Sequence, residues 1–113
     1  MSVISEEQIL EQIKQLVAEN RIMLFMKGTP EAPRCGFSAR VAERLFEADV
    51  EFAALDIVLD PRIRTVLSGW SNWPTIPQLF VDGELVGGCD LVEELAASGE
   101  LAAVLAPKDG QEA

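Results

Sequence analysis

The sequence contains no histidine and only two cysteines, Cys35 and Cys89, among its 113 residues. A closed structural metal site needs four thiolate or imidazole ligands, so one chain cannot build such a site from its own side chains. Any thiolate-rich metal centre must therefore take ligands from other molecules. Residues 1–7 also lack the basic start and apolar stretch of a secretory signal. We therefore expect a cytosolic protein with reduced thiols.

Basic residues and long apolar runs are also scarce. Nine lysines and arginines stand against nineteen acidic residues, which gives a formal net charge of −10. Such a surface repels phosphate backbones and anionic lipids, so we expect neither nucleic acid nor a membrane as a partner. The apolar runs are too short to cross a bilayer. The length is that of one domain, which we place at residues 1–106, followed by a polar tail at 107–113.

Hydrophobic periodicity and turn residues predict an alternation of helices and strands. The expected elements are a helix from Ser5, a strand at 22–26, a proline-containing loop at 27–34, a helix from Gly36 to about Ala48, a strand at 52–57, a short helix from Asp60 to Gly69, a hairpin at 78–86, a helix at 91–97 and a last turn at 100–105. This order predicts an α/β protein of the thioredoxin-like pattern, with a four-stranded mixed sheet and helices on both faces.

Three helix starts carry capping signals. Ser5 with Gln8, and Asp90 with Glu93, have the three-residue spacing of a capping box. Asp60 is followed by a proline, which is favoured at the first position of a helix. We therefore expect side-chain caps at all three positions.

Cys35 stands directly before the second expected helix. A cysteine at a helix start faces unpaired N–H groups and the positive end of the helix dipole, which lower its pKa. The alternative is an inert core cysteine, but Arg34 and Gly36 beside it favour an exposed, reactive thiol. Ser38 occupies the position of the second cysteine of a two-cysteine redox motif, and its hydroxyl cannot form a disulfide. We expect Phe37 to lie in the core rather than to contact a ligand.

Four further groups of residues stand in a characteristic order and spacing. They are Met26-Lys27-Gly28-Thr29-Pro30, Pro33 with Cys35-Gly36-Phe37-Ser38, Trp73-Pro74-Thr75-Ile76-Pro77-Gln78, and Gly87-Gly88-Cys89-Asp90. With these motifs the chain resembles the monothiol glutaredoxins of the Cys-Gly-Phe-Ser type from about Ile9 to Leu105. The resemblance implies a thioredoxin-like fold and a site for glutathione beside Cys35.

The resemblance assigns two basic residues to the glycyl carboxylate of glutathione. Lys27 pairs with that carboxylate in this interpretation and helps to keep thiolates ionised, and Arg64 is the second contact. Each has a simpler alternative. A lysine that ends a strand is usually a solvated charge, and Arg64 can equally be a surface arginine offset by Asp60 or other acids.

The resemblance also assigns the remainder of the glutathione site. Thr75, Ile76 and Pro77 resemble a cis-proline turn that binds the cysteinyl part like an added strand; the alternative is an ordinary trans proline. Gly88 and Cys89 begin a helix that holds the γ-glutamyl carboxylate, and Asp90 meets the ligand ammonium. Asp90 could instead serve only as a cap, and Cys89 as a resolving thiol for Cys35; both alternatives remain open at this stage.

The ligand count indicates how Cys35 could serve a metal cluster. One Cys35 from each of two chains and one glutathione sulfur on each supply the four thiolates of a 2Fe-2S cluster. The resemblance implies a cytosolic homodimer that carries this cluster to apo iron–sulfur proteins, with a BolA-type partner and a role in iron homeostasis. Two alternatives are a monothiol glutathione-disulfide oxidoreductase with Cys35 as catalytic nucleophile and a non-redox interaction module on the same scaffold.

Overall fold

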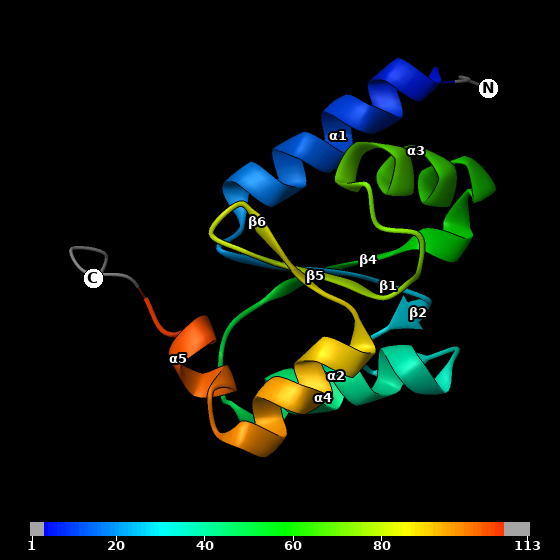
Figure 1. Ribbon diagram of the computed structural model, residues 1–113. Coiled ribbons are helices and arrows are strands. Elements are labelled where there is room, and N and C mark those ends of the chain that lie inside the picture. Colours follow the sequence, from blue (N-terminus) through cyan, green and yellow to red (C-terminus); the bar gives the residue numbers. More distant parts are fainter. Residues whose placement is uncertain (1–3, 108–113) are drawn as a thin grey trace.

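A four-stranded mixed sheet forms the centre of the computed structural model, in which residues 4–107 are described (Figure 1). The strand order is β4-β1-β5-β6, with β1 parallel to β4 and the other neighbours antiparallel. The strands are β1 (Ile22–Met26), β4 (Ala53–Asp56), β5 (Gln78–Val81) and β6 (Glu84–Gly87). The mixed sheet expected from the sequence is therefore confirmed.

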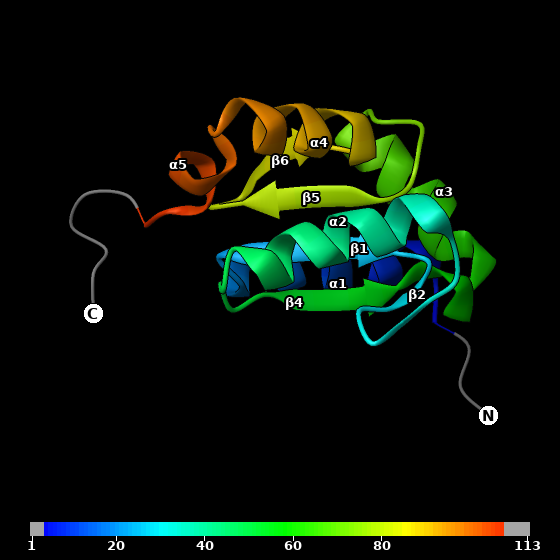
Figure 2. The same cartoon turned by 90° about the horizontal axis from the view of Figure 1, so that it is seen from below.

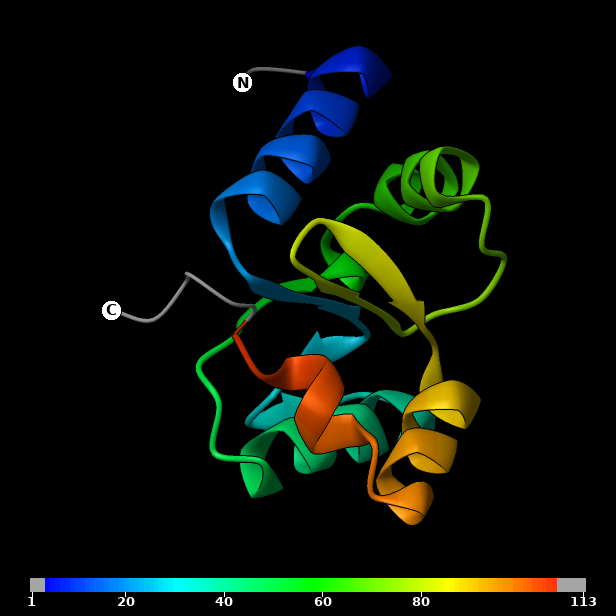
Figure 3. The same cartoon turned by 60° about the vertical axis from the view of Figure 1, so that its left-hand side comes forward.

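Helices cover both faces of this sheet (Figures 1 and 3). Those on one face are α1 (Glu6–Glu19) and α3 (Pro61–Ser71), and those on the other are α2 (Gly36–Glu47), α4 (Cys89–Ser98) and α5 (Leu101–Leu105). Successive side chains of a strand point to opposite faces, so Met23 and Phe25 pack with α1 and α3 while Leu24 and Met26 pack with α2 and α4. The continuous apolar run of β1 is thus explained by burial on both sides.

The segment between β1 and Cys35 is a small hairpin rather than the loop expected from its prolines. Its strands are β2 (Gly28–Thr29) and β3 (Ala32–Pro33), and it leads directly into α2 (Figure 2). Gly28 has a positive φ of +86°, and a Cβ there would lie 2.5 Å from the Ala32 carbonyl oxygen, so only glycine fits. The Gly28 N–H donates to the Asp56 carboxylate at 2.9 Å, which fixes the hairpin to the end of β4.

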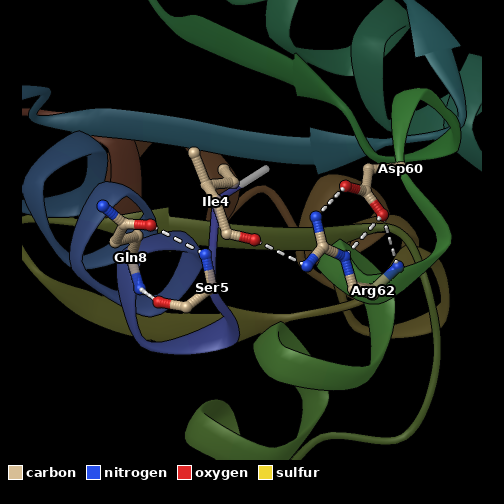
Figure 4. Close-up of polar contacts among 5 residues, drawn as sticks. All are labelled: Ile4, Ser5, Gln8, Asp60 and Arg62. Atoms are coloured by element: carbon tan, nitrogen blue, oxygen red, sulfur yellow. Dashed lines mark hydrogen bonds and ion pairs between the residues drawn. The ribbon is translucent and has the colours of Figure 1, made fainter. Parts of the chain in front are cut away.

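The start of α1 is fixed as the first predicted capping box requires. The Gln8 N–H donates to Ser5 Oγ at 3.1 Å, and the Ser5 N–H donates to Gln8 Oε1 at 2.7 Å (Figure 4). Asp60 also caps α3, because its carboxylate accepts the Arg62 N–H at 3.0 Å. The Arg62 side chain pairs with the same carboxylate and donates to the Ile4 carbonyl, so it joins α3 to the start of α1.

The structure corrects the expected bounds of three elements. The helix placed at Asp60 to Gly69 continues to Ser71, because Asn72, with a φ of 58°, takes the left-handed conformation that ends it. The strand placed at 52–57 is shorter, since Ile57 already begins the 3-10 helix η1 (Ile57–Leu59). The helix α4 begins at Cys89 with Gly88 as its N-cap.

The second predicted capping box is wrong. No side chain caps α4, and Asp90 lies within its first turn. Glu93 instead forms an ion pair with Arg44 of α2, which joins the two helices across 49 positions in sequence. A long-range partner has therefore taken the side chain that the local pattern assigned to the cap.

Two sequence expectations concern the ends and a membrane. Residues 108–113 of the expected polar tail lie outside the described residues. Among the helices at 4–107, none combines the length and the apolar character needed to cross a membrane.

Candidate functional site

Cys35 is the N-cap residue of α2. Its backbone is extended, with φ −154° and ψ 150°, and its sulfur accepts the N–H of Ser38 at 3.4 Å. The thiol is free and partly exposed. The position at a helix start, which the sequence predicted, is confirmed.

Ser38 holds the same sulfur with its side chain. Its Oγ lies 3.5 Å from Cys35 Sγ and accepts the N–H of Lys27 at 3.0 Å. The Ser38 side chain has no exposed surface, so water does not compete for these bonds. Because Lys27 already donates to this oxygen, the hydroxyl proton is available for the sulfur.

These contacts lower the pKa of Cys35. Partial burial of the thiol acts in the opposite direction and raises it. That effect is outweighed by the hydrogen bonds from the Ser38 N–H and hydroxyl, by the N–H of Phe37 and by the positive charge of Lys27. The structure thus favours the thiolate, the nucleophilic and metal-binding form of cysteine.

A cavity of about 330 Å³ lies beside this thiol, between α3, the loop before β5 and the start of α4. All eight residues that the sequence assigned to ligand binding line it, and they are Lys27, Arg64, Thr75, Ile76, Pro77, Gly88, Cys89 and Asp90. Cys35 itself is not among the lining residues, but its helix contributes Phe37 to the wall. Residues from four separate segments are therefore brought together as one site.

Three lining residues were not foreseen. Phe37 was expected in the core, but it is 55% exposed and forms part of the cavity wall. The reason is that the first turn of α2 extends past the edge of the core. Trp73 and Leu91 also line the cavity. Trp73 stood in one of the quoted motifs, whereas no sequence signal separated Leu91 from other helix residues.

The charged groups of the cavity have no charged partners among the residues that the structure describes. Across residues 4–107, neither Lys27 nor Arg64 has a carboxylate within 4.0 Å, and the Asp90 carboxylate accepts no hydrogen bond from a side chain or the backbone. Asp60, which the alternative interpretation set against Arg64, forms its ion pair with Arg62. Two cations and one carboxylate are thus left for a ligand that carries both signs of charge.

The turn before β5 is rigidly held. The Ile76–Pro77 peptide bond is cis, as the sequence motif suggested. The buried side chain of Gln78 donates to the carbonyls of Trp73 and Thr75 at 3.0 and 3.2 Å. In the described part of the chain the Trp73 indole nitrogen is buried without an acceptor, so the cavity wall also carries an unused donor.

Cys89 differs from Cys35 in its surroundings. It is free, 7% exposed, and packs into the core between α2 and α4. Burial raises the pKa of its thiol, although Arg40 acts in the opposite direction. The pKa of Cys35 is thus lowered and that of Cys89 is raised, so Cys35 is the cysteine that more readily forms a thiolate.

A larger hollow of about 630 Å³ lies at the other end of β1, lined among others by Arg21, Ile22, Phe52 and Leu105. None of the residues that the sequence singled out lies in it. The smaller cavity beside Cys35 is the candidate functional site, because the partly exposed thiol, the unpaired charges of the cavity and the cis-proline turn come together there.

Comparison with known proteins agrees with this arrangement. Residues 22–86 match the model of the glutaredoxin family. Glutaredoxin 4 of Pasteurella multocida (strain Pm70) is 50% identical over 99 residues, covering 88% of this chain and 91% of the relative. Monothiol glutaredoxin-S11 of Oryza sativa subsp. japonica is 50% identical over 103 residues, which are 91% of this chain but 21% of that longer protein.

Solved structures of glutaredoxins share the fold of this chain. The crystal structure of a buckwheat glutaredoxin–glutathione complex superposes with a TM-score of 0.77 and 26% identity, over 88% of this chain and 89% of that one. The family match covers more than half of the chain, and the bacterial relative is matched over nearly its whole length. The chain therefore belongs to the glutaredoxin family, among the monothiol glutaredoxins.

Proposed function

We propose that this chain carries a 2Fe-2S cluster as a glutathione-dependent homodimer and passes it to apo iron–sulfur proteins in the cytoplasm. One observation supports this most: the eight predicted ligand residues line a single cavity next to a thiol with a lowered pKa. A BolA-type protein is the partner that the family resemblance suggests, and iron homeostasis is the process.

Glutathione is the ligand that the cavity suits. It carries a thiol, one ammonium and two carboxylates. In this proposal Lys27 and Arg64 bind the glycyl carboxylate, and Asp90 binds the ammonium. Among residues 4–107 these three side chains form no ion pairs, and this supports the assignment. Binding of glutathione therefore does not have to break an existing ion pair. A related glutaredoxin from buckwheat was crystallised with glutathione.

The donor set fits a shared cluster. Within the described residues no three histidine, cysteine or acidic side chains come together as a metal site. Cys35 offers one partly exposed thiolate, and Ser38 beside it cannot oxidise with it to a disulfide. Two copies of Cys35 and two glutathione sulfurs reach the four thiolates that a 2Fe-2S cluster needs. The cluster is then cargo held between two protomers.

Anaerobic reconstitution with iron and sulfide tests the proposal, run with and without glutathione. We expect a coloured dimer on gel filtration only when glutathione is present. A colourless monomer that nevertheless binds glutathione would contradict the carrier function.

The lowered pKa of Cys35 favours a second candidate function, a monothiol oxidoreductase. The Cys35 thiolate attacks the glutathione sulfur of a glutathionylated substrate, and the substrate thiolate leaves. A second glutathione thiolate then attacks that same sulfur, which releases glutathione disulfide and restores the Cys35 thiolate. A coupled glutathione-reductase assay measures this turnover. Rapid turnover in wild type and Cys89→Ser, abolished in Cys35→Ser and with no cluster formed, would favour catalysis over carriage.

A further inference from the structure

Arg40 is an exposed cation beside the cavity, although not one of its lining residues, and neither the sequence motifs nor the proposed function assigns it a role. It lies on α2, and its guanidinium carbon is 5.8 Å from the centre of the Phe37 ring, within the range of a cation–π contact. Burial raises the pKa of the Cys89 thiol, and Arg40 acts on the same pKa in the opposite direction. Phe37 and Cys89 both line the cavity. Arg40 therefore lies where α2 and α4 meet at the rim of the site.

The charge of Arg40 is not neutralised by an ion pair. No carboxylate lies within 4.0 Å of it in the described range 4–107. The charge of Arg40 also acts on Glu93, but Glu93 is already paired with Arg44. Arg40 thus remains free to attract an anion from solution.

The cations around the cavity come from both faces of the sheet. Arg64 belongs to α3 on one face, and Lys27 directly follows the end of the central strand β1. Arg40 belongs to α2 on the other face, where α2 packs against α4 (Figure 3). A ligand that crosses the cavity from α3 to α4 therefore meets positive charge at each end.

The start of α4 can bind an anionic group of a ligand. Gly88 provides no side-chain cap, so the first N–H groups of the helix remain available for an anion. Asp90 in the same turn repels such a group, and a cation nearby is needed to offset that repulsion.

We infer that Arg40 is a specificity-determining residue that binds the second carboxylate of a dianionic thiol ligand at the start of α4. This inference rests on the proposed binding of glutathione, whose γ-glutamyl α-carboxylate is that second group. Lys27 and Arg64 select for the glycyl carboxylate, and Arg40 selects for the γ-glutamyl one.

A pair of ligands tests this assignment. One is glutathione, and the other is its analogue with 4-aminobutyrate in place of the γ-glutamyl residue, which lacks only the α-carboxylate. Affinities of both are measured by isothermal titration calorimetry at low ionic strength for wild type, Arg40→Ala and Arg40→Lys. Arg34→Ala serves as the matched control, because Arg34 is also an exposed arginine near Cys35.

We expect Arg40→Ala to weaken glutathione binding about fivefold, as for an exposed charge pair, and to leave binding of the analogue unchanged. Arg40→Lys should recover part of the loss, and Arg34→Ala should weaken both ligands equally or neither. If Arg40→Ala weakens both ligands by the same factor, or neither, the inference is wrong. Failure of the wild type to bind glutathione would instead contradict the proposed function itself.

Discussion

The Ser38 hydroxyl lies 3.5 Å from the sulfur of Cys35 and accepts the N–H of Lys27 at 3.0 Å. Ser38, which stands where a two-cysteine redox motif has its second cysteine, therefore contributes contacts of its own. It links the thiolate to the end of β1 and stabilises the negative charge on sulfur. A chain with this serine loses the option of an internal disulfide at the motif and retains a stabilised thiolate.

Replacement of Ser38 by alanine should raise the pKa of Cys35, because the thiolate loses one of its hydrogen-bond donors. The pH dependence of alkylation by iodoacetamide measures this, and the midpoint should move to higher pH. The partly buried Lys27 N–H also loses its acceptor, which should cost about 1–2 kcal/mol of unfolding free energy. Ser68→Ala is the control, because it deletes the hydroxyl of another serine, which lies in α3. Equal midpoints for Ser38→Ala and wild type would show that the hydroxyl does not stabilise the thiolate.

The same thiol should make stability depend on pH. Its pKa is lower in the folded state than in the unfolded chain, so folding favours the ionised form. Its contribution is fully present above the unfolded value of about 8.5 and is lost as pH falls through the lowered folded pKa. The free energy of unfolding of wild type relative to Cys35→Ser should therefore increase with pH across this window. Urea unfolding at several pH values tests this, and a difference that falls as pH rises contradicts it.

Two phenylalanines should respond differently to truncation. Phe25 is 0% exposed and makes an edge-to-face contact with Phe80, so Phe25→Ala should lower the free energy of unfolding by about 3–5 kcal/mol. Phe37 is 55% exposed, so Phe37→Ala should cost about 1 kcal/mol or less. Urea unfolding measures both. Equal losses would mean that Phe37 is a core residue after all.

Two glycines form a similar matched pair. Gly28 and Gly83 have nearly the same positive φ, +86° and +83°. A Cβ on Gly28 would overlap the Ala32 carbonyl oxygen at 2.5 Å, whereas one on Gly83 would meet nothing within 4 Å. Gly83→Ala should cost about 1 kcal/mol from backbone strain alone, and Gly28→Ala about 3 kcal/mol or more. Thermal unfolding of both variants checks this, and it would be contradicted if Gly83→Ala were the more damaging change.

Most helices and strands could be predicted from the sequence because each depends mainly on residues that are close together in the chain. The Ser5–Gln8 box and the apolar strand 22–26 depend on neighbouring residues, and both are confirmed. The Asp90–Glu93 box failed because Arg44, far away in sequence, binds Glu93 instead. A motif defined by a three-residue spacing cannot predict a partner that lies 49 positions away.

The site was predicted by a different kind of reasoning. Motif resemblance named the eight lining residues, which come from separate segments that periodicity does not connect. Periodicity misplaced Phe37, because it identifies the apolar side of a helix but not where the core ends along that helix. The sequence likewise does not reveal that Arg40 lacks an ion pair among residues 4–107, because this depends on the packing of α2 against α4, where Glu93 pairs with Arg44 instead.

The visible absorption spectrum after anaerobic reconstitution with glutathione, compared for Cys35→Ser and Cys89→Ser, tests the central claim most directly. In the proposed function Cys35 is the cluster ligand, and Cys89 is a buried thiol of the glutathione site. We predict that Cys35→Ser stays colourless and that Cys89→Ser develops the charge-transfer bands of a 2Fe-2S cluster. A coloured Cys35→Ser protein, or a colourless Cys89→Ser protein that still binds glutathione, would contradict the account.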